Sequence, residues 1–242
     1  MIACTLKEID VSFDVQSDSY GKDPDFASAT MKSYHKLLWS KPLPNGDILK
    51  LEDCKDCYLK WNNIYLGSDS ITATFRNGRN KHFEEFKSGI PNYPKFEKDV
   101  LSKLYTIGGA IIFPQTPWSI NRARGFHPRI CDRWDFTLEC IRRYYAGESS
   151  PLDRSLGESE KFFNLFLNFK GYVDFFLLQD CVDEQYKVRF WDKTPIFEVN
   201  PMPKTLDSYL VWVKTQLNFT EKRNQRIQNY CNSKIGNDWN II

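Results

Sequence analysis

Apolar side chains recur at helical spacing near the start of the chain. A helix is predicted over residues 25–39, where apolar and aromatic residues follow one another three to five positions apart: Phe26, Met31, Tyr34 and Leu38. Pro42 and Pro44 come next and are expected to end this helix, because proline lacks an amide donor and restrains the residue before it.

A second helical pattern covers residues 132–147. Its apolar positions repeat at intervals of four, three and four residues: Trp134, Leu138, Ile141 and Tyr145. Asp132 has a side chain suited to capping the first turn, and Gly147 is a typical stop signal. A helix that begins at Asp132 and ends before Gly147 is therefore predicted.

The C-terminal half holds two further helical stretches. Residues 160–182 are rich in apolar and aromatic side chains, so one or two buried helices are expected there, with Gly171 as the candidate break. Residues 205–231 are predicted to form one long helix. Its buried face is expected to carry four aliphatic residues: Leu206, Leu210, Val213 and Leu217.

Strand patterns lie mainly in the first half of the chain. Residues 65–75 mix β-branched and polar side chains, and residues 105–113 form an apolar run closed by Pro114, so both are predicted strands. A short strand is also expected over residues 186–191. Strands mainly in the N-terminal half and packed helices in the C-terminal half indicate the α+β class.

Length and composition fit one globular domain. The chain has 242 residues, of which 41% are hydrophobic and 26% are charged, an ordinary balance for a soluble protein. Aromatic residues make up 15% of the chain, which implies a thick core. We expect a single domain over residues 1–242, with a soft division near residues 118–120 as the candidate boundary.

The sequence contains no recognisable targeting or membrane segment. Its N-terminus lacks the basic and apolar regions of a secretory signal, and its apolar runs are far shorter than the ~20 residues of a membrane span. Seven scattered cysteines fit reduced thiols better than a disulfide framework. We therefore expect a cytoplasmic protein with no membrane partner, whereas the sequence indicates neither a cofactor nor an oligomeric state.

Charge is balanced overall but not locally. The 33 Lys and Arg residues against 31 Asp and Glu argue against a protein that coats nucleic acid. Residues 120–145 nevertheless hold six of the twelve arginines: Arg122, Arg124, Arg129, Arg133, Arg142 and Arg143. The last two would share one side of the predicted helix with Asp135 and Glu139, which is typical of a solvated face with ion pairs.

An anion site is the alternative interpretation of this segment. Residues 121–129 are expected to form a loop in which Gly125 allows a tight backbone course. Polar side chains of this loop would face one hollow, together with Arg133: Asn121, Arg122, Arg124, His127 and Arg129. Guanidinium groups match phosphate or carboxylate oxygens two at a time, and free amides at a helix N-terminus also favour an anion.

Acid–base candidates lie in the same segment. Positive neighbours should keep His127 neutral, which suits a general base, although a histidine that only packs in a loop is the simpler explanation. Glu139 and Asp135 are the candidate carboxylates.

A second candidate contact lies at the end of the first predicted helix. His35, Trp39 and Lys41, with Ser40 between them, would line a pocket for a flat ring. The same residues would equally suit a helix end that packs on the core.

Other motifs give little support to a defined chemistry. Cys54 and Cys57 have the spacing of metal ligands but no second pair accompanies them, so no metal site is expected. The dinucleotide, P-loop, G-x-S-x-G and H-E-x-x-H patterns are absent. Asp69 with Glu85 and Lys87 has a nuclease-like composition of very low specificity.

Six segments of the chain are distinctive: GKDPD, YHKLLWSKPLPNG, YTIGG, DRWDFTLECIRRYY, SPL and GYVDFFLLQD. Together they resemble a family of mostly bacterial proteins known only as a domain of unknown function. The resemblance covers nearly the whole chain and implies one integral domain. It implies no activity, so no catalytic residue is carried over from it.

The first of two functional hypotheses is an intracellular enzyme that acts on a phosphate-bearing substrate, either a nucleotide or a nucleic acid. In this hypothesis the loop arginines hold the anion, and His127 or Glu139 transfers a proton. Trp39 would stack on a base. An aspartate would supply charge or a metal ligand: Asp23, Asp25 or Asp135.

The second hypothesis is a non-catalytic module that binds nucleic acid or an acidic protein. The same loop would act together with the C-terminal segment 221–234, where Arg223 and Arg226 would contact phosphates. Balanced overall charge, with polar residues of both signs in one segment, favours the enzyme.

Overall fold

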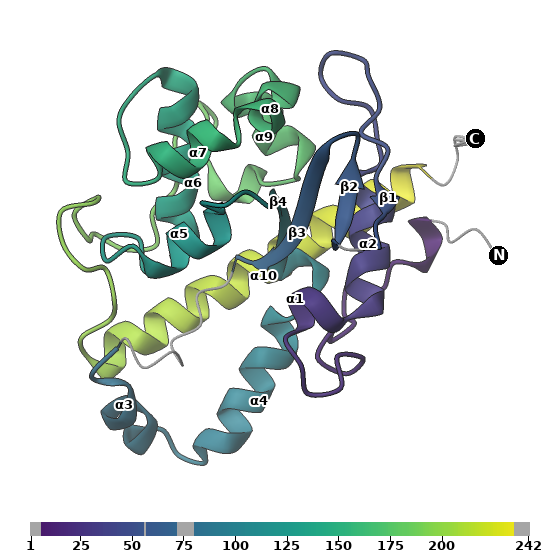
Figure 1. Cartoon of the computed structure of the whole chain (residues 1–242). Coiled ribbons are helices and arrows are strands. Elements are labelled where there is room, and N and C mark those ends of the chain that lie inside the picture. Colours follow the sequence, from purple (N-terminus) through teal and green to yellow (C-terminus); the bar gives the residue numbers. More distant parts are fainter. Residues whose placement is uncertain (1–5, 56, 72–79, 235–242) are drawn as a thin grey trace.

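A four-stranded antiparallel sheet runs through the middle of the protein in the computed structural model, which describes residues 6–55, 57–71 and 80–234 (Figure 1). Its strands lie side by side in chain order: β1 (Glu52–Asp53), β2 (Leu59–Trp61), β3 (Ile64–Ser70) and β4 (Ala110–Pro114). The β3–β4 pairing runs from Leu66 opposite Pro114 to Ser70 opposite Ala110. Since helices of the C-terminal half pack around this sheet, the predicted α+β class is confirmed.

The two predicted strands of the first half are shorter than expected. Of the predicted strand 65–75, residues 72–75 lie outside the described part of the chain. Within residues 105–113, a 3₁₀ turn at Ile107–Gly109 precedes β4. This turn packs closely against the backbone of the C-terminal helix. A Cβ atom at Gly108 would lie only 2.7 Å from the carbonyl oxygen of Thr220, so the contact requires glycine.

The predicted helix over residues 25–39 is divided into two. Helix α1 (Pro24–Ala27) ends at Ser28, and α2 (Ala29–Trp39) begins directly after it. The Ser28 hydroxyl accepts the Met31 amide at 3.0 Å, an N-cap that fixes the start of α2. The end of α2 at Trp39 agrees with the prolines that follow.

Two helices between β3 and β4 were not predicted from the sequence. Helices α3 (Phe83–Gly89) and α4 (Tyr93–Leu104) pack on the C-terminal helix. The apolar side chains at this contact form a cluster separate from the main core: Phe86, Ile90, Tyr93, Tyr209, Trp212 and Val213.

Helix α6 (Trp134–Ala146) agrees closely with its prediction. Gly147 ends the helix in a left-handed conformation, with φ 70°. The predicted N-cap is wrong, because Arg133 occupies that position and Asp132 lies before it at φ 65°. The Asp132 carboxylate instead pairs with Arg124.

The segment before the C-terminal helix breaks at a different place from the one predicted. Helices α7 (Asp153–Glu158), α8 (Glu160–Phe163) and α9 (Phe169–Phe175) follow one another. The break is at Leu167, where φ is 64°, and Gly171 lies within α9. Glycine is needed there because a Cβ atom would lie 2.1 Å from the carbonyl oxygen of Phe166.

The short strand expected over residues 186–191 is also wrong. Within the described residues, this segment contributes only an isolated bridge between Val182 and Val188. Too few residues pair there to form a strand.

The C-terminal helix α10 (Leu206–Lys234) has 29 residues and runs behind the sheet (Figure 1). Its existence was predicted, and its buried face in part: Val213 is buried and Leu206 and Leu217 pack on the second cluster, whereas Leu210 is 37% exposed. The inward side chains are both apolar and polar: Tyr209, Trp212, Val213, Gln216, Phe219, Thr220, Arg223, Ile227 and Cys231.

Arg223 joins α10 to two other parts of the fold. Its guanidinium is fully buried and donates to the Phe176 carbonyl at 3.3 and 3.0 Å, directly after α9. It also donates to the carbonyls of Gly108 at 3.0 Å and Ala110 at 2.7 Å, at the start of β4. No carboxylate of the described residues forms an ion pair with it.

Arg223→Met should lower the free energy of unfolding by about 3 kcal/mol, because buried carbonyl oxygens would lose their donors. Arg226→Met is the matched control on the same helix. It breaks only a partly exposed ion pair with Asp180 and should cost less than about 1 kcal/mol. Urea denaturation followed by circular dichroism measures both, and equal losses would contradict a structural role for Arg223.

Candidate functional site

The arginines of residues 120–145 do not share one hollow. The expected loop over residues 121–129 is largely a helix, α5 (Ile120–Phe126), so Gly125 lies inside the helix rather than in a tight turn. Arg122 and Arg129 are exposed. The other four arginines form ion pairs with carboxylates of the protein: Arg124, Arg133, Arg142 and Arg143.

Arg124 is fully buried and stabilises a strained turn. Its guanidinium lies 2.8 Å from Asp69 and 2.7 Å from Asp132, and its Nε donates to the Thr137 hydroxyl at 3.1 Å. Another guanidinium nitrogen donates to the backbone carbonyl of Asp132 at 2.8 Å. Because Cys131 and Asp132 both have positive φ, at 48° and 65°, these contacts hold a turn that few residues adopt unaided.

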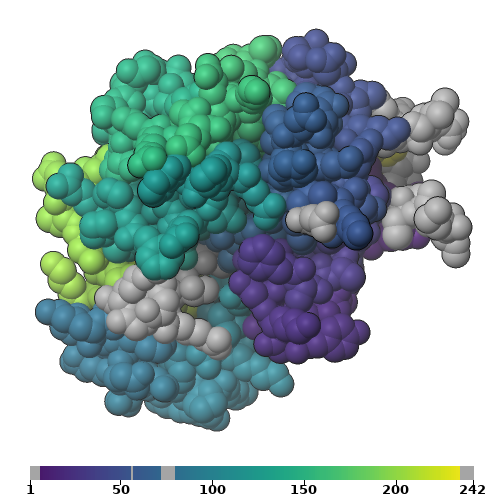
Figure 2. Space-filling view, in the orientation of Figure 1, coloured from purple at the N-terminus to yellow at the C-terminus, as the bar shows by residue number. Residues whose placement is uncertain are grey.

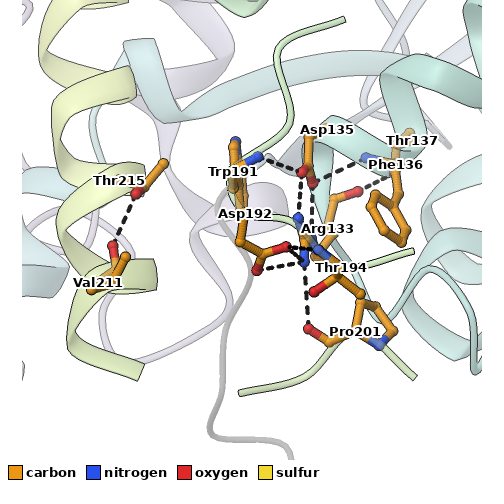
Figure 3. Close-up of polar contacts among 10 residues, drawn as sticks. All are labelled: Arg133, Asp135, Phe136, Thr137, Trp191, Asp192, Thr194, Pro201, Val211 and Thr215. Carbon is orange, nitrogen blue, oxygen red and sulfur yellow. Dashed lines mark hydrogen bonds and ion pairs between the residues drawn. The ribbon is translucent and has the colours of Figure 1, made fainter. Parts of the chain in front are cut away.

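Arg133 and Asp135 form a second buried network (Figure 3). Arg133 donates from Nε to Asp135 at 3.0 Å, and from Nη1 to Asp192 at 3.1 and 3.0 Å. Asp135 also accepts the Trp191 amide at 2.9 Å. The pair therefore attaches the start of α6 to the chain around residues 190–201.

Glu139 is likewise saturated by guanidinium groups. Its carboxylate accepts from Arg142 at 2.8 and 2.9 Å and from Arg143 at 2.9 Å, and its side chain is only 7% exposed. The two carboxylates on the polar side of α6 are thus buried, whereas a solvated face was expected. Asp135 and Glu139 are both engaged by arginines in this structure.

His127 follows the end of α5 and, of the candidate residues, contacts Arg129. Its Nδ1 accepts the Arg129 amide at 3.2 Å. Partial burial, and next the charge of Arg129, lower the pKa of His127, which is the direction expected from its positive neighbours.

A directed chain of hydrogen bonds starts at Trp39 and ends at Asp25. The Trp39 indole donates to His35 Nδ1 at 2.9 Å, His35 Nε2 lies 3.1 Å from the Ser68 hydroxyl, and Ser68 donates to Asp25 at 3.0 Å. Since an indole N–H can only donate, His35 carries its proton on Nε2. Burial and the charge of Arg223 lower the pKa of His35 to about 3, so this histidine positions its neighbours and is not a base.

Asp25 lies on the wall of a polar cavity of about 440 Å³, which we call the aspartate pocket. Four carboxylates line it: Asp23, Asp25, Asp69 and Asp132. Figure 2 shows the N-terminal segment directly against the sheet residues on this side. Burial, and next the charge of Asp23, raise the pKa of Asp25 to about 6.

The aspartate pocket is not a built metal site. In the part of the chain that the structure describes, no three His, Cys, Asp or Glu side chains are placed to hold a metal ion. Asp69 also fails the nuclease-like hypothesis, because it pairs with Arg124 whereas Glu85 is 80% exposed beside His82.

A second and larger cavity, of about 540 Å³, lies at the end of α2 and is called the lysine pocket. Three lysines and mainly apolar side chains line it: Leu6, Leu37, Ser40, Lys41, Pro42, Leu43, Pro44, Ile48, Phe166, Asn168, Lys170, Gly171, Asp174, Phe175, Tyr230 and Lys234. Ser40 and Lys41 lie on the wall of this cavity. His35 and Trp39 are fully buried and do not line it.

Lys41 has an unusual environment. Its ammonium donates to the carbonyl of Phe175 and lies 4.9 Å from the Trp39 ring, 4.6 Å from the Phe175 ring and 4.7 Å from the Tyr230 ring. Within the described ranges, no carboxylate forms an ion pair with it. Burial, and next the charge of Arg223, lower the pKa of Lys41 to about 7.

The cysteines differ from the sequence expectation at one place. Cys54 and Cys57 form a disulfide, although reduced thiols were expected. The other described cysteines are free and buried: Cys131, Cys140, Cys181 and Cys231. Across the described helices, none combines the length and the apolar character needed to cross a membrane.

One family of known proteins is similar to this chain. The sequence model of a family of unknown function, DUF6994, matches residues 9–227. The chain belongs to this family. No curated protein and no solved structure matches the chain. The predicted membership of an uncharacterised family is thereby confirmed, and Asp25, Lys41 and Arg223 all lie within the DUF6994 match.

The position of Arg223 in this DUF6994 chain is what sequence reasoning missed. It was predicted as a phosphate contact on an exposed helix, yet it lies in the interior. One signal was present, because Phe219, Arg223 and Ile227 are spaced by four residues and so share a helix face.

Wild-type protein should lose stability in mild acid more steeply than His35→Gln. Below the ordinary pKa of 6.5 an unfolded histidine binds a proton, whereas folded His35 does not until about pH 3. Folding therefore excludes a proton in this interval, and the free energy of unfolding should fall by up to about 1.4 kcal/mol per pH unit as pH decreases. Urea denaturation at several pH values from 6.5 to 4 measures the difference between the two slopes.

Asp25 changes the free energy of unfolding with pH in the opposite direction, because its raised pKa lets the folded state retain a proton between about pH 6 and pH 3.8. This stabilises the folded state as pH decreases, and it is present in both proteins. The difference between their slopes therefore isolates His35, and parallel curves would contradict a buried, neutral histidine.

Proposed function

We propose that the protein is a cytoplasmic enzyme that acts on a phosphate-bearing small molecule bound in the lysine pocket. One observation carries this proposal. Lys41 and Arg223 are cations in and behind the same wall, and neither forms an ion pair with a carboxylate of the described residues. Because uncompensated charge away from water is costly, an anionic ligand would stabilise this arrangement.

In this proposed site the anion contacts Lys41 and not the arginines of residues 120–145. Arg124, Arg133 and Arg142 already have carboxylate partners, so little of their hydrogen-bonding capacity is left for a substrate. A cavity of about 540 Å³ has the size of a small-molecule site, which favours a small phosphate ester over a nucleic-acid strand. A nucleotide is one member of this substrate class.

The state of Lys41 supports an enzyme rather than a passive binder. An amine with a pKa of about 7 exchanges its proton at neutral pH, so it can both contact an anion and take part in proton transfer. Strongly perturbed pKa values in a cavity are typical of functional sites.

Little supports the non-catalytic alternative. Arg223 lies in the interior, and Arg226 makes two hydrogen bonds of 2.9 Å to Asp180. Both residues were expected to contact phosphates on the surface of the C-terminal helix.

Wild-type protein should bind at least one member of a panel of nucleoside monophosphates, sugar phosphates and alkyl phosphates. Lys41→Met should bind that compound at least about tenfold more weakly, because a hydrogen bond to a charged group contributes roughly 1.5–3 kcal/mol. Isothermal titration calorimetry measures the affinity, and ³¹P NMR detects turnover.

Lys36→Met is the control, since Lys36 lies in α2, shortly before Lys41 in the chain, but is outside the pocket and paired with Asp53. It removes the same charge and should leave affinity unchanged. If no member of the panel binds the wild type, or if Lys41→Met binds as well as the wild type does, the proposed function is wrong.

A further inference from the structure

We infer that the ligand of the lysine pocket is an amphipathic phosphate monoester, with its phosphate at Lys41 and a hydrocarbon or unsubstituted aromatic body against the apolar wall. This inference rests on the proposed function and narrows its substrate class. It also departs from the nucleotide that the sequence suggested.

The wall of the pocket is predominantly apolar. Leu37, Pro42, Pro44, Ile48 and Phe166 all contribute to it. Ile48 is 51% exposed, an unusual position for an isoleucine. A ligand body that covers this side chain would remove apolar surface from water, which is the main source of affinity for such ligands.

Most other polar side chains of the lining are already engaged within the protein. The Ser40 hydroxyl accepts the Leu51 amide at 3.0 Å, and the Asn168 side chain accepts the Gly171 amide at 2.9 Å. Both therefore serve the fold.

The acidic side chain of the lining is engaged in the same way. Asp174 accepts hydrogen bonds from Gln179 and Tyr186, each at 3.0 Å, and pairs with Lys170. Few acceptors remain for the hydroxyls of a ribose or the amino group of a base. A nucleotide would therefore leave polar groups without hydrogen bonds when it entered the pocket.

Positive charge is concentrated at one place in the pocket. The charge of Lys170 is compensated by Asp174, whereas the charges of Arg223 and Lys234 both act on Lys41. Rings of Trp39, Phe175 and Tyr230 around the ammonium restrict its movement. One positioned cation beside an apolar wall matches one anionic head on an apolar body.

Four probes separate the head from the body of the ligand. Octyl phosphate has both parts, inorganic phosphate has only the head, octanol has only the body, and adenosine monophosphate joins the head to a polar body. With wild-type protein in calorimetry, octyl phosphate should bind at least tenfold more tightly than each of the other three.

Two substitutions in the pocket assign the contacts. Lys41→Met should weaken octyl phosphate at least tenfold, whereas Lys36→Met should have no effect. Ile48→Asn removes apolar surface from an exposed side chain without adding charge, so it should weaken octyl phosphate several-fold without changing the affinity for inorganic phosphate. Melting temperatures of all variants, measured in parallel, show whether each protein is folded.

The outcomes distinguish this inference from the proposed function. If adenosine monophosphate binds as tightly as octyl phosphate and depends on Lys41, the amphipathic ligand is wrong and the proposed function stands. If octyl phosphate does not bind but vesicles containing phosphatidic acid do, the ligand is a membrane lipid and the inference as stated is wrong. If no phosphate compound shows a dependence on Lys41, both proposals fail.

Discussion

The buried guanidinium of Arg223 is the interaction on which the rest of the structure depends. It donates four hydrogen bonds to the carbonyls of Phe176, Gly108 and Ala110, and so joins the long helix α10 to the end of α9 and to the start of β4. Burial lowers the pKa of Arg223 to about 10, which still leaves it charged at neutral pH. Its charge also lowers the pKa of both His35 and Lys41, so one structural residue affects the lysine pocket and the buried histidine behind Trp39.

The buried arginines of this protein fall into two kinds. Arg124 and Arg133 each form ion pairs with two aspartates, so their charges are compensated within the protein. Arg223 is held by carbonyl dipoles alone, so the interior around it stays positive. That difference explains why the arginine-rich segment offers little to an anion, whereas the lysine pocket, where Lys41 has no ion pair with a carboxylate of the described residues, is the better candidate.

Much of the secondary structure could be predicted from local patterns. Helix α6 and its Gly147 stop, the long helix α10 and the α+β class all follow from periodicity and stop signals. Helices α3 and α4 were missed, although Phe96, Val100 and Leu104 of α4 recur at intervals of four residues and so share one helix face. The 186–191 strand failed because short apolar runs do not by themselves specify a pairing partner.

The sequence by itself determined that α6 and α10 exist and that α6 ends before Gly147, because periodicity and stop signals act over a few neighbouring residues. It left open whether Lys41 lines a pocket or packs with the helix end on the core. Only the tertiary structure decided which partner each charged side chain has. The partners of Arg124 and Arg223 lie 55 and 113 residues away in the chain at Asp69 and Ala110, and no local pattern records such distances. Burial and the resulting pKa of Lys41 depend on those same long-range contacts.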